Sequence, residues 1–294
     1  MRLVYFGTPA MAVPPLEALC AEGHEVLLVV TGADTRRGRG SAVSPSPVKA
    51  AARELGLAVS EEPLDVLGLQ ADLAVVVAYG RIISTQLLDH LSMVNLHFSL
   101  LPRWRGAAPV ERAILAGDST TGVCIMKVEE GLDTGGIYAQ ATLDLDDQIT
   151  AQELRVKLVQ VGSELLVTAL ADGLGEAVAQ SEEGVTYAHK LHSSDAELHW
   201  EKLTNELLRT IRVGGAWTIF RQKRLKVLHA RKSNRSQGGT GRTEITPGLL
   251  TEAVTVRTGD SWIDLLLVQP EGKSAMGAQE WANGARPAGE VLGR

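Results

Sequence analysis

The sequence predicts an α/β protein in which an N-terminal, Rossmann-like domain with a parallel sheet precedes a small β-barrel. Apolar strands alternate with helices near the start of the chain, a pattern typical of a doubly wound parallel sheet. Beyond residue 202, short β-prone stretches are separated by Gly- and Ser-rich turns, as in small barrels. The 294 residues also exceed the usual size of one domain. We expect domains at 1–180 and 202–294, joined by a connector at 181–201.

The expected elements of the first domain follow from hydrophobic runs and helix-start signals. Continuous apolar runs, typical of strands covered on both faces, lie at 2–6, 25–31, 73–78 and 94–97. A helix at 16–21 follows two prolines, and a second is expected at 48–55. A third begins at the capping-box pattern Thr150–Glu153 and ends near Gly173–Gly175.

The expected elements of the second domain are shorter. A helix at 204–212 precedes strands at 217–220, 225–230, 253–257 and 262–269. A last helix is expected at 275–283, with Gly284 as its stop.

The charge of the chain is divided unevenly along the sequence. The whole chain carries −6, yet residues 202–294 hold 15 Lys and Arg against 8 Asp and Glu. Such a split suggests a basic module that meets a polyanion, although an ordinary solvated surface gives the same composition. Hydrophobic residues make up 45% and charged residues 22%, as in globular proteins that carry a full core.

Targeting signals and disulfide or metal motifs are not expected. The apolar start is interrupted at Gly7-Thr8-Pro9, and no apolar run approaches the ~20 residues of a membrane span. Cys20 and Cys124 are far apart and form no metal-ligand pattern. We therefore predict a cytoplasmic protein with two free thiols and no bound metal.

The residues that suggest chemistry are Asn95, His97 and Asp133. Asn95 and His97 are two apart on a predicted strand end, so they point to one face. Asp133 lies in a glycine-rich turn. An amide and an imidazolium could stabilise an oxyanion, while the carboxylate charges the histidine or accepts a proton from an amine. No nucleophile elbow is present, so an acyl-enzyme is not indicated. Taken alone, such residues are more often a core histidine and a turn-forming aspartate.

These residues also carry a resemblance to a known family. The stretch Asn95–Pro109 together with Asp133–Gly135 resembles the active-site signature of formyltransferases that use 10-formyltetrahydrofolate. Further segments resemble the methionyl-tRNA formyltransferase family, in the same order along the chain: Phe6–Pro9, Gly38–Gly40, Pro45–Lys49 and Gln269–Lys273. The resemblance therefore covers nearly the whole chain.

The resemblance implies a reaction and its substrates. It implies transfer of the formyl group of 10-formyltetrahydrofolate to the amino group of initiator methionyl-tRNA, by a monomer without a metal. Asn95, His97 and Asp133 fall on the catalytic trio. The folate pocket falls on a stretch whose backbone lines it: Tyr79, Gly80, Arg81, Ile82 and Ile83.

The tRNA contacts implied by the resemblance are basic. Three fall on the loop at 32–44, which is also compatible with a disordered surface loop: Arg36, Arg37 and Arg39. Three more are expected on the second domain, which resembles a barrel of the oligonucleotide-binding (OB) type: Arg221, Lys223 and Arg224.

Departures from the family pattern leave alternatives open. The loop at 33–43 and the segment Val213–Trp217 differ from the usual sequences, and His199-Trp200 stands where Asp-Trp is common. These changes affect RNA contacts more than the trio. A folate-dependent enzyme that formylates an amino-sugar nucleotide or a purine precursor remains an alternative, as does a non-enzymatic RNA-binding protein.

Overall fold

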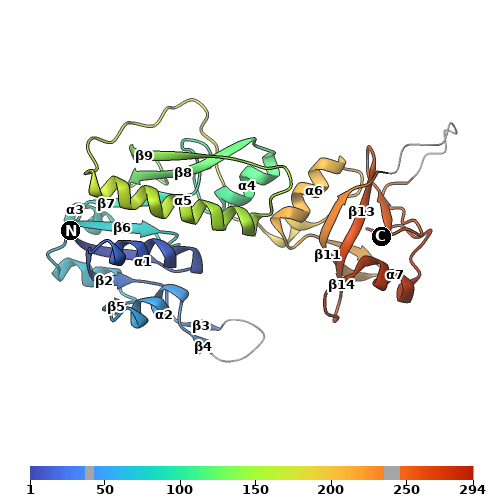
Figure 1. Ribbon diagram of the computed structural model, residues 1–294, viewed down its shortest axis with the longest axis horizontal. Coiled ribbons are helices and arrows are strands. Elements are labelled where there is room, and N and C mark those ends of the chain that lie inside the picture. Colours follow the sequence, from blue (N-terminus) through green and yellow to red (C-terminus); the bar gives the residue numbers. More distant parts are fainter. Residues whose placement is uncertain (37–42, 235–245, 294) are drawn as a thin grey trace. The chain divides into compact units, whose positions relative to one another are not determined.

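The computed structural model describes residues 1–36, 43–234 and 246–293, and its contacts divide the chain into two compact units (Figure 1). The first unit comprises Met1–Arg112, Ser119–Leu145 and Glu153–Lys190, and the second comprises Ala113–Asp118, Asp146–Gln152 and Leu191–Arg294. Each unit has its own hydrophobic core. The predicted connector is shared between them, because Tyr187 pairs with Arg105 in the first unit whereas Trp200 lies in the core of the second.

The first unit contains a seven-stranded sheet in the order β5-β2-β1-β6-β7-β8-β9. The first five strands in this order run parallel to one another, and β8 and β9 complete the sheet with antiparallel pairings. The strand bounds are β1 Arg2–Gly7, β2 Glu25–Val30, β5 Val59–Ser60, β6 Leu73–Val77, β7 Met93–His97, β8 Thr120–Lys127 and β9 Ile137–Asp144. The expected Rossmann-like sheet is thus confirmed, while β5, β8 and β9 were not predicted.

The apolar runs form central strands because both faces of the sheet are covered. All five residues of β6 are buried, and Leu3 to Phe6 of β1 have no exposed surface. Every second residue of these strands faces one side of the sheet. On that side, Val4 of β1 and Ala74 of β6 pack with residues of α3 and of a 3-10 helix at Pro63–Gly68. Burial on this scale contributes about 25 cal/mol per Å² of apolar surface removed from water.

The helices of this unit have the bounds α1 Val13–Ala21, α2 Pro47–Glu54, α3 Thr85–His90, α4 Pro109–Ala116 and α5 Ala151–Ala171. The side chain of Ser46 caps α2 by accepting a hydrogen bond from the amide of Lys49. Helix α5 packs closely on β7: a β-carbon added to Gly162 of the helix would lie only 3.0 Å from the side chain of Leu96. The prediction missed α3 and α4. A short ribbon of β3 (Thr35–Arg36) and β4 (Val43–Ser44) precedes α2.

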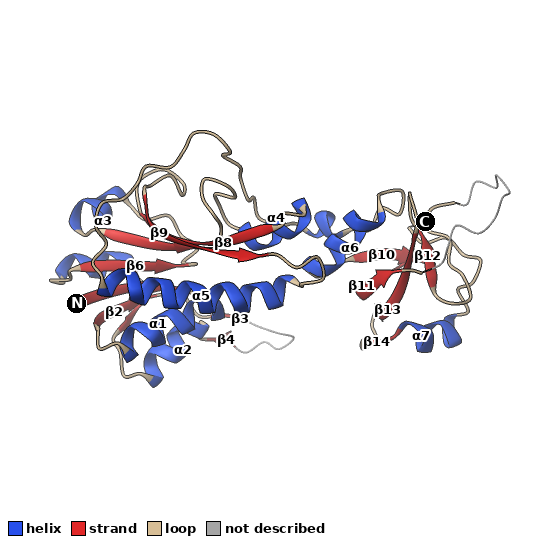
Figure 2. Cartoon of the chain, turned by 45° about the horizontal axis from the view of Figure 1, so that its top comes forward, coloured by secondary structure: helices blue, strands red, loops and turns tan. Residues whose placement is uncertain are grey.

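The second unit contains a curled antiparallel sheet, a half-barrel that agrees with the expected OB-like fold (Figure 2). Its order is β10-β11-β13-β12, with β14 also paired to β13. The bounds are β10 Trp217–Phe220, β11 Lys223–Lys232, β12 Thr255–Arg257, β13 Trp262–Pro270 and β14 Met276–Gly277. The register between β11 and β13 shifts around His229, and such bulges increase strand bending.

Two helices pack on this sheet, α6 at Thr204–Val213 and α7 at Ala278–Ala285. Leu207 and Ile211 of α6 and Trp281 of α7 lie in its core. The predicted stop of the last helix at Gly284 is wrong, because the helix continues to Ala285 and ends where Arg286 adopts a left-handed conformation. Among the described residues, no helix combines the length and apolar character that crossing a membrane requires.

Candidate active site

Strand β7 presents Asn95 and His97 at its carboxyl end. The strand pairs with β6 on one side and with β8 on the other, where His97 is the register partner of Cys124. Alternation along the strand places Asn95 and His97 on one face. His97 is only 5% exposed. The carboxyl ends of neighbouring parallel strands are where open α/β sheets bind ligands.

Asp133 reaches these side chains from the turn between β8 and β9. Its backbone has φ +50°, a conformation that non-glycine residues rarely adopt. The turn is held close to β8, because a β-carbon on Gly135 would lie 1.9 Å from the carbonyl oxygen of Lys127. Only glycine fits at this position, so the glycine-rich sequence directly determines where the carboxylate lies.

The three predicted residues come together around the carboxylate of Asp133. Its Oδ1 lies 3.5 Å from Nδ2 of Asn95, and its Oδ2 lies 3.6 Å from Nδ1 of His97. The backbone amide of Gly106 donates a 2.7 Å hydrogen bond to the same Oδ2. The side chain of Asp133 is 14% exposed, so the carboxylate is held in a largely desolvated cluster.

A second acceptor faces the other nitrogen of His97. Nε2 lies 2.9 Å from the carbonyl oxygen of Trp104, and it must donate in this contact because a carbonyl only accepts. Nδ1 of His97 faces Oδ2 of Asp133 at 3.6 Å, the distance of an ion pair when the ring is protonated rather than of a hydrogen bond. The amide of Asn95 directs one hydrogen toward Oδ1 of Asp133 and keeps its second hydrogen for another acceptor.

A nucleophilic thiol is not available at this cluster. Cys124 is fully buried, and burial raises the pKa of its thiol to about 11. The hydroxyl of the buried Ser99 donates to the carbonyl of Arg103. Direct attack by an amine on an acyl donor, with stabilisation of the developing negative charge, is the chemistry that fits these groups. In the described part of the chain, no group of three His, Cys, Asp or Glu side chains could hold a metal ion.

The segment predicted to line a folate pocket follows β6 directly, beside β7 in the sheet. Tyr79 is buried against Phe6, with ring centroids 5.2 Å apart, and its carbonyl accepts from the hydroxyl of Thr8. Gly80 turns the chain at φ +78°, and Ile82 is 96% exposed. Arg81 donates to the carbonyl of Glu61, and Ile83 packs against the core from its partly buried position. The segment thus offers backbone groups and an unburied apolar side chain.

The basic loop predicted to contact tRNA is described only at its base. Arg36 lies in β3, whereas Arg37 and Arg39 lie outside the described residues. Lys49 closes the base by donating to Asp34 at 2.7 Å and to Glu61 at 2.6 Å. These two hydrogen bonds raise the pKa of Lys49, against the opposing effect of burial.

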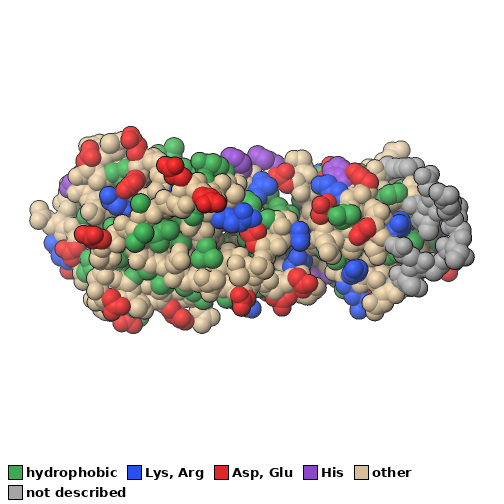
Figure 3. All heavy atoms as spheres, turned by 90° about the horizontal axis from the view of Figure 1, so that it is seen from above, with side chains coloured by type: hydrophobic (Ala, Val, Ile, Leu, Met, Phe, Trp, Pro, Cys, Tyr) green, Lys and Arg blue, Asp and Glu red, His purple; other side chains and the backbone are tan. Residues whose placement is uncertain are grey.

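The three basic residues predicted on the second unit have different surroundings. Arg221 pairs with Glu290, and Lys223 is exposed at the start of β11. Arg224 lies 3.9 Å from the centre of the Trp217 ring, a cation–π distance. On the face drawn in Figure 3, acidic and basic side chains are interspersed, so charge alone does not outline a single track for phosphates there.

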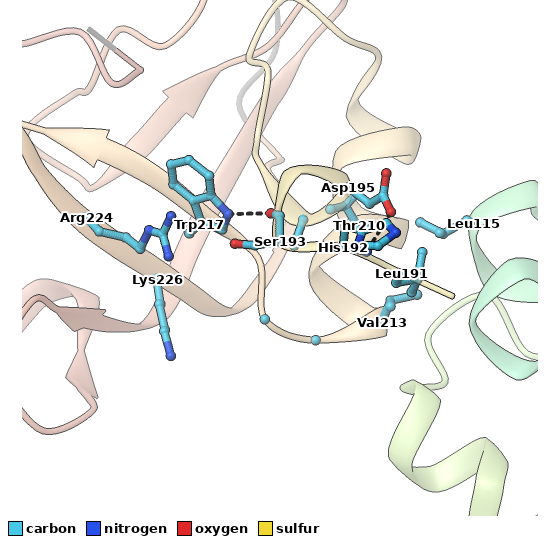
Figure 4. Close-up of a pocket in the computed structure, with 13 residues that line it drawn as sticks. Leu115, Leu191, His192, Ser193, Asp195, Thr210, Val213, Trp217, Arg224 and Lys226 are labelled. Atoms are coloured by element: carbon cyan, nitrogen blue, oxygen red, sulfur yellow. Dashed lines mark hydrogen bonds between the residues drawn. The ribbon is translucent and has the colours of Figure 1, made fainter. Parts of the chain in front are cut away.

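Arg224 and Trp217 also line a pocket of about 320 Å³ in the second unit (Figure 4). The indole nitrogen of Trp217 donates to the carbonyl of Ser193, Arg224 lies against its ring, and Lys226 extends from the neighbouring strand on the same side as Arg224. Aromatic rings accompanied by basic side chains are a means by which proteins stack bases and hold phosphates. Trp217 and Lys226 were not among the predicted site residues, although both lie in predicted strands.

The groups that contact His97 and Asp133 were not predicted individually. Trp104 and Gly106, which contact His97 and Asp133 respectively, lie within the recognised stretch Asn95–Pro109, so their position was a usable signal. Gln180, which donates to the backbone carbonyl of Asp133, lies in a segment without such a signal. A polar pocket of about 500 Å³ borders this region and is lined in part by Arg105, Lys127, Thr134, Gln180 and Tyr187.

Comparison with known families identifies the class of protein that this fold and site define. Residues 1–170 match the formyl transferase family, and residues 190–286 match the formyl transferase C-terminal domain. Together they account for both units, so the protein is an enzyme of the formyl transferase class.

Individual relatives narrow this class. The chain is 43% identical to a methionyl-tRNA formyltransferase from Roseobacter denitrificans over 97% of its own length and 96% of the relative's. The chain therefore belongs to the methionyl-tRNA formyltransferase family.

Solved structures share the fold at low sequence identity. An N-formyltransferase from Helicobacter canadensis, in complex with folinic acid and dTDP-3-aminofucose, matches with a TM-score of 0.68 at 18% identity, covering 91% of this chain and 98% of that one. A methionyl-tRNA formyltransferase from Clostridium thermocellum matches with a TM-score of 0.59 at 16% identity, covering 80% of this chain and 95% of that one.

Proposed function

We propose that the protein transfers the formyl group of 10-formyltetrahydrofolate to the amino group of methionyl-initiator tRNA, for the initiation of protein synthesis. The observation that carries the proposal is the convergence of Asn95, His97 and Asp133 at the carboxyl edge of the sheet. Relatives with 41–43% identity over nearly the full length, named methionyl-tRNA formyltransferase, support the choice of acceptor.

The three side chains divide the chemistry among them. 10-formyltetrahydrofolate supplies the formyl carbon that the methionyl nitrogen attacks. The amide of Asn95 donates to the formyl oxygen as negative charge develops there, and the imidazolium of His97 adds positive charge nearby. Asp133 holds His97 and accepts the proton that the attacking amine loses. The new carbon–nitrogen bond forms first. The bond from the formyl carbon to the folate nitrogen then breaks, and that nitrogen takes up the proton that Asp133 accepted from the amine.

The residues at the sheet edge fit a reduced folate. The segment 79–83 follows β6, and β6 is the direct neighbour of the strand that carries Asn95 and His97. Backbone groups beyond a strand end can give fixed donors and acceptors to a pterin ring, and the exposed Ile82 offers apolar surface to it. We propose that Tyr79, Gly80, Arg81, Ile82 and Ile83 line this pocket.

The charged acceptor requires contacts beyond the catalytic trio. We propose that Arg36, Arg37 and Arg39 contact the acceptor end, while Arg221, Lys223 and Arg224 contact phosphates. The pocket that joins Trp217, Arg224 and Lys226 supports this assignment for the second unit. Contacts of this kind release counterions, so binding of tRNA should weaken steeply as salt is raised.

The experiment that tests the function supplies the purified protein with 10-formyltetrahydrofolate and charged initiator tRNA. We expect formylmethionyl-tRNA, and no product from tRNA that carries no amino acid. Parallel reactions with dTDP-amino sugars test the other class of acceptor. The structure of the Helicobacter canadensis enzyme contains one such sugar, dTDP-3-aminofucose. Formylation of the sugars alone would refute the proposed acceptor. Binding of RNA without any binding of a reduced folate would refute enzymatic function.

We further propose that the protein acts as a monomer in the cytoplasm, where charged tRNA is made. Light scattering during gel filtration at the concentration of the assay should give the 31.4 kDa mass of one chain.

A further inference from the structure

The turn that carries Asp133 is held by a side chain far from it in the sequence. The amide nitrogen of Gln180 donates to the backbone carbonyl of Asp133 at 2.9 Å and to that of Gly135 at 2.7 Å. Both amide hydrogens are therefore used on the two carbonyls that flank the tip of the turn. Gln180 follows α5, 47 residues after Asp133.

The orientation of this amide is set by Arg105. Its Nε and one of its terminal nitrogens lie 3.0 Å and 2.6 Å from Oε1 of Gln180. Because a guanidinium only donates and carbonyls only accept, the amide oxygen must face Arg105 and the amide nitrogen must face the turn. All the hydrogen-bonding capacity of the Gln180 amide is thus committed, and a flipped amide would lose every contact.

Arg105 belongs to the same backbone segment as Gly106, which binds the carboxylate of Asp133. The backbone amide of Arg105 donates to the carbonyl of Thr186, and its carbonyl accepts from the amide of Ala188. The next residue, Gly106, donates to Oδ2 of Asp133. Gln180 therefore connects the segment that binds the carboxylate of Asp133 to the turn that carries its backbone.

Asp133 needs such support because its backbone is strained. Asp133 has φ +50°, and a non-glycine residue in this conformation persists only where surrounding contacts impose it. The two hydrogen bonds from Gln180 bind the carbonyl of the strained residue and that of its second neighbour. Without them, the turn can relax to an unstrained conformation, and the carboxylate would move away from His97.

The geometry points to Gln180 as a positioning residue for formyl transfer, one that acts by holding the Asp133 turn and that is itself oriented by Arg105. This inference rests on the proposed function. Gln180 does not touch the reacting atoms, so its loss should lower turnover while leaving substrate binding unchanged. A displacement of about 1 Å at a reacting group can cost roughly 100-fold in rate.

The test compares Gln180→Met and Gln180→Glu with the wild type in single-turnover and steady-state formylation of charged initiator tRNA. Met has a similar length and cannot donate, whereas Glu keeps the acceptor for Arg105 and loses both donors. We expect each variant to lower the rate about 10- to 100-fold, with KM for folate and tRNA within twofold of wild type. Gln140→Met, at an exposed position on β9, is the matched control and should keep the wild-type rate.

A double-mutant comparison distinguishes the positioning of Asp133 from a general contribution of Gln180 to folding. In an Asp133→Asn background the group to be positioned is already altered, so adding Gln180→Met should lower the rate no further. An additive loss in the double variant would overturn the proposal, as would wild-type rates in both single variants. A variant that fails to fold by circular dichroism is replaced by the other, since both make the same prediction. Inactive wild-type protein would instead refute the proposed function itself.

Discussion

The backbone amide of Gly106 and the imidazole of His97 face the same oxygen of Asp133, its Oδ2. Gly106 has φ +118°, and a β-carbon at this position would lie 3.0 Å from the carbonyl oxygen of Ala188. Glycine is therefore needed for the amide to reach the carboxylate. It follows that the position of Asp133 does not depend on His97 alone, and that the trio can be probed one side chain at a time.

Asn95→Ala and Asp133→Ala should each slow formyl transfer by at least about 100-fold. Asn95→Ala removes a donor to the developing negative charge, and the loss of one such donor raises the barrier by about 2.7–4 kcal/mol. Asp133→Ala removes the group that accepts the proton of the amine. Both variants should keep the wild-type circular dichroism spectrum, since neither side chain belongs to an apolar core.

Rates from single-turnover reactions check this prediction. Asp172→Ala, an exposed aspartate after α5, is the control for removal of a carboxylate from the same unit. Near-normal rates in the Asn95 and Asp133 variants would refute the assignment of the active site.

Arg39→Ala should raise the KM for charged initiator tRNA and leave the affinity for a reduced folate unchanged. Arg39 lies outside the described residues, so this prediction rests on the resemblance of its loop and on the anchored base that Lys49 forms with Asp34 and Glu61. An arginine fork suits phosphates and base edges, which tRNA carries.

Titration with a reduced folate and steady-state kinetics with tRNA separate the two effects. Arg53→Ala, at the end of α2, serves as a control for loss of a positive charge. Equal losses of folate and tRNA affinity in the Arg39 variant would show that the loop has been misplaced in function.

Much of the fold was predictable because it rests on strong local patterns. The runs at 2–6 and 73–78 are buried on both faces, and continuous apolar sequence is what such burial requires. Strand β9 was missed because its residues alternate between partly buried and exposed positions without a strongly apolar face. In β8, Gly122 separates two threonines from the apolar residues 123–126, which leaves only a short apolar run. A β-carbon on Gly122 would lie 2.1 Å from the carbonyl oxygen of Ala141.

The candidate site was predictable only in part. Asn95 and His97 are two residues apart, and strand geometry alone places them on one face. Asp133 was connected to them by resemblance, since no local pattern brings a turn to a strand 36 residues earlier. Gln180 was not predictable, because its contacts with Asp133 and Arg105 arise from tertiary packing of a segment that has no regular secondary structure.

Cys124 should not react with thiol reagents in the native protein. The thiolate is the reactive form, and a pKa of about 11 leaves roughly one thiol in a thousand ionised at pH 8. Cys20 is partly exposed, so a disulfide reagent at pH 8 should modify one thiol per native chain and the second only after denaturant is added.

A Cys20→Ser variant should therefore show no rapid reaction before unfolding. Cys124→Ala should retain formyl transfer within a few-fold of wild type, because the proposed reaction has no covalent intermediate on the protein. Loss of activity in a correctly folded Cys124→Ala variant would revive a nucleophilic role for this thiol.

Asp260 should stabilise the second unit in a pH-dependent way. It accepts hydrogen bonds from the backbone amide of Thr204 at 2.7 Å and from its hydroxyl at 2.8 Å, at the start of α6. Burial opposes ionisation, yet the hydrogen bonds from Thr204 and Thr258 outweigh it and lower the pKa of Asp260. The stabilisation is thus fully present above the unfolded-state pKa of about 4 and is lost as pH falls through the lower pKa of the folded state.

Asp260→Asn keeps a hydrogen-bond acceptor at the N-terminus of α6 and removes the negative charge. It should lower the unfolding free energy by about 0.5–1 kcal/mol at pH 7, the size of a charge interaction with a helix terminus. Unfolding in urea, followed by tryptophan fluorescence, reports mainly on this unit, because it contains Trp200, Trp217, Trp262 and Trp281. The difference in unfolding free energy between wild type and variant should shrink as pH is lowered from 7 to 3. Glu252→Gln, at an exposed position in the same unit, should show no such difference. If the difference in unfolding free energy between wild type and Asp260→Asn stays constant down to pH 3, the charge of the carboxylate does not stabilise α6.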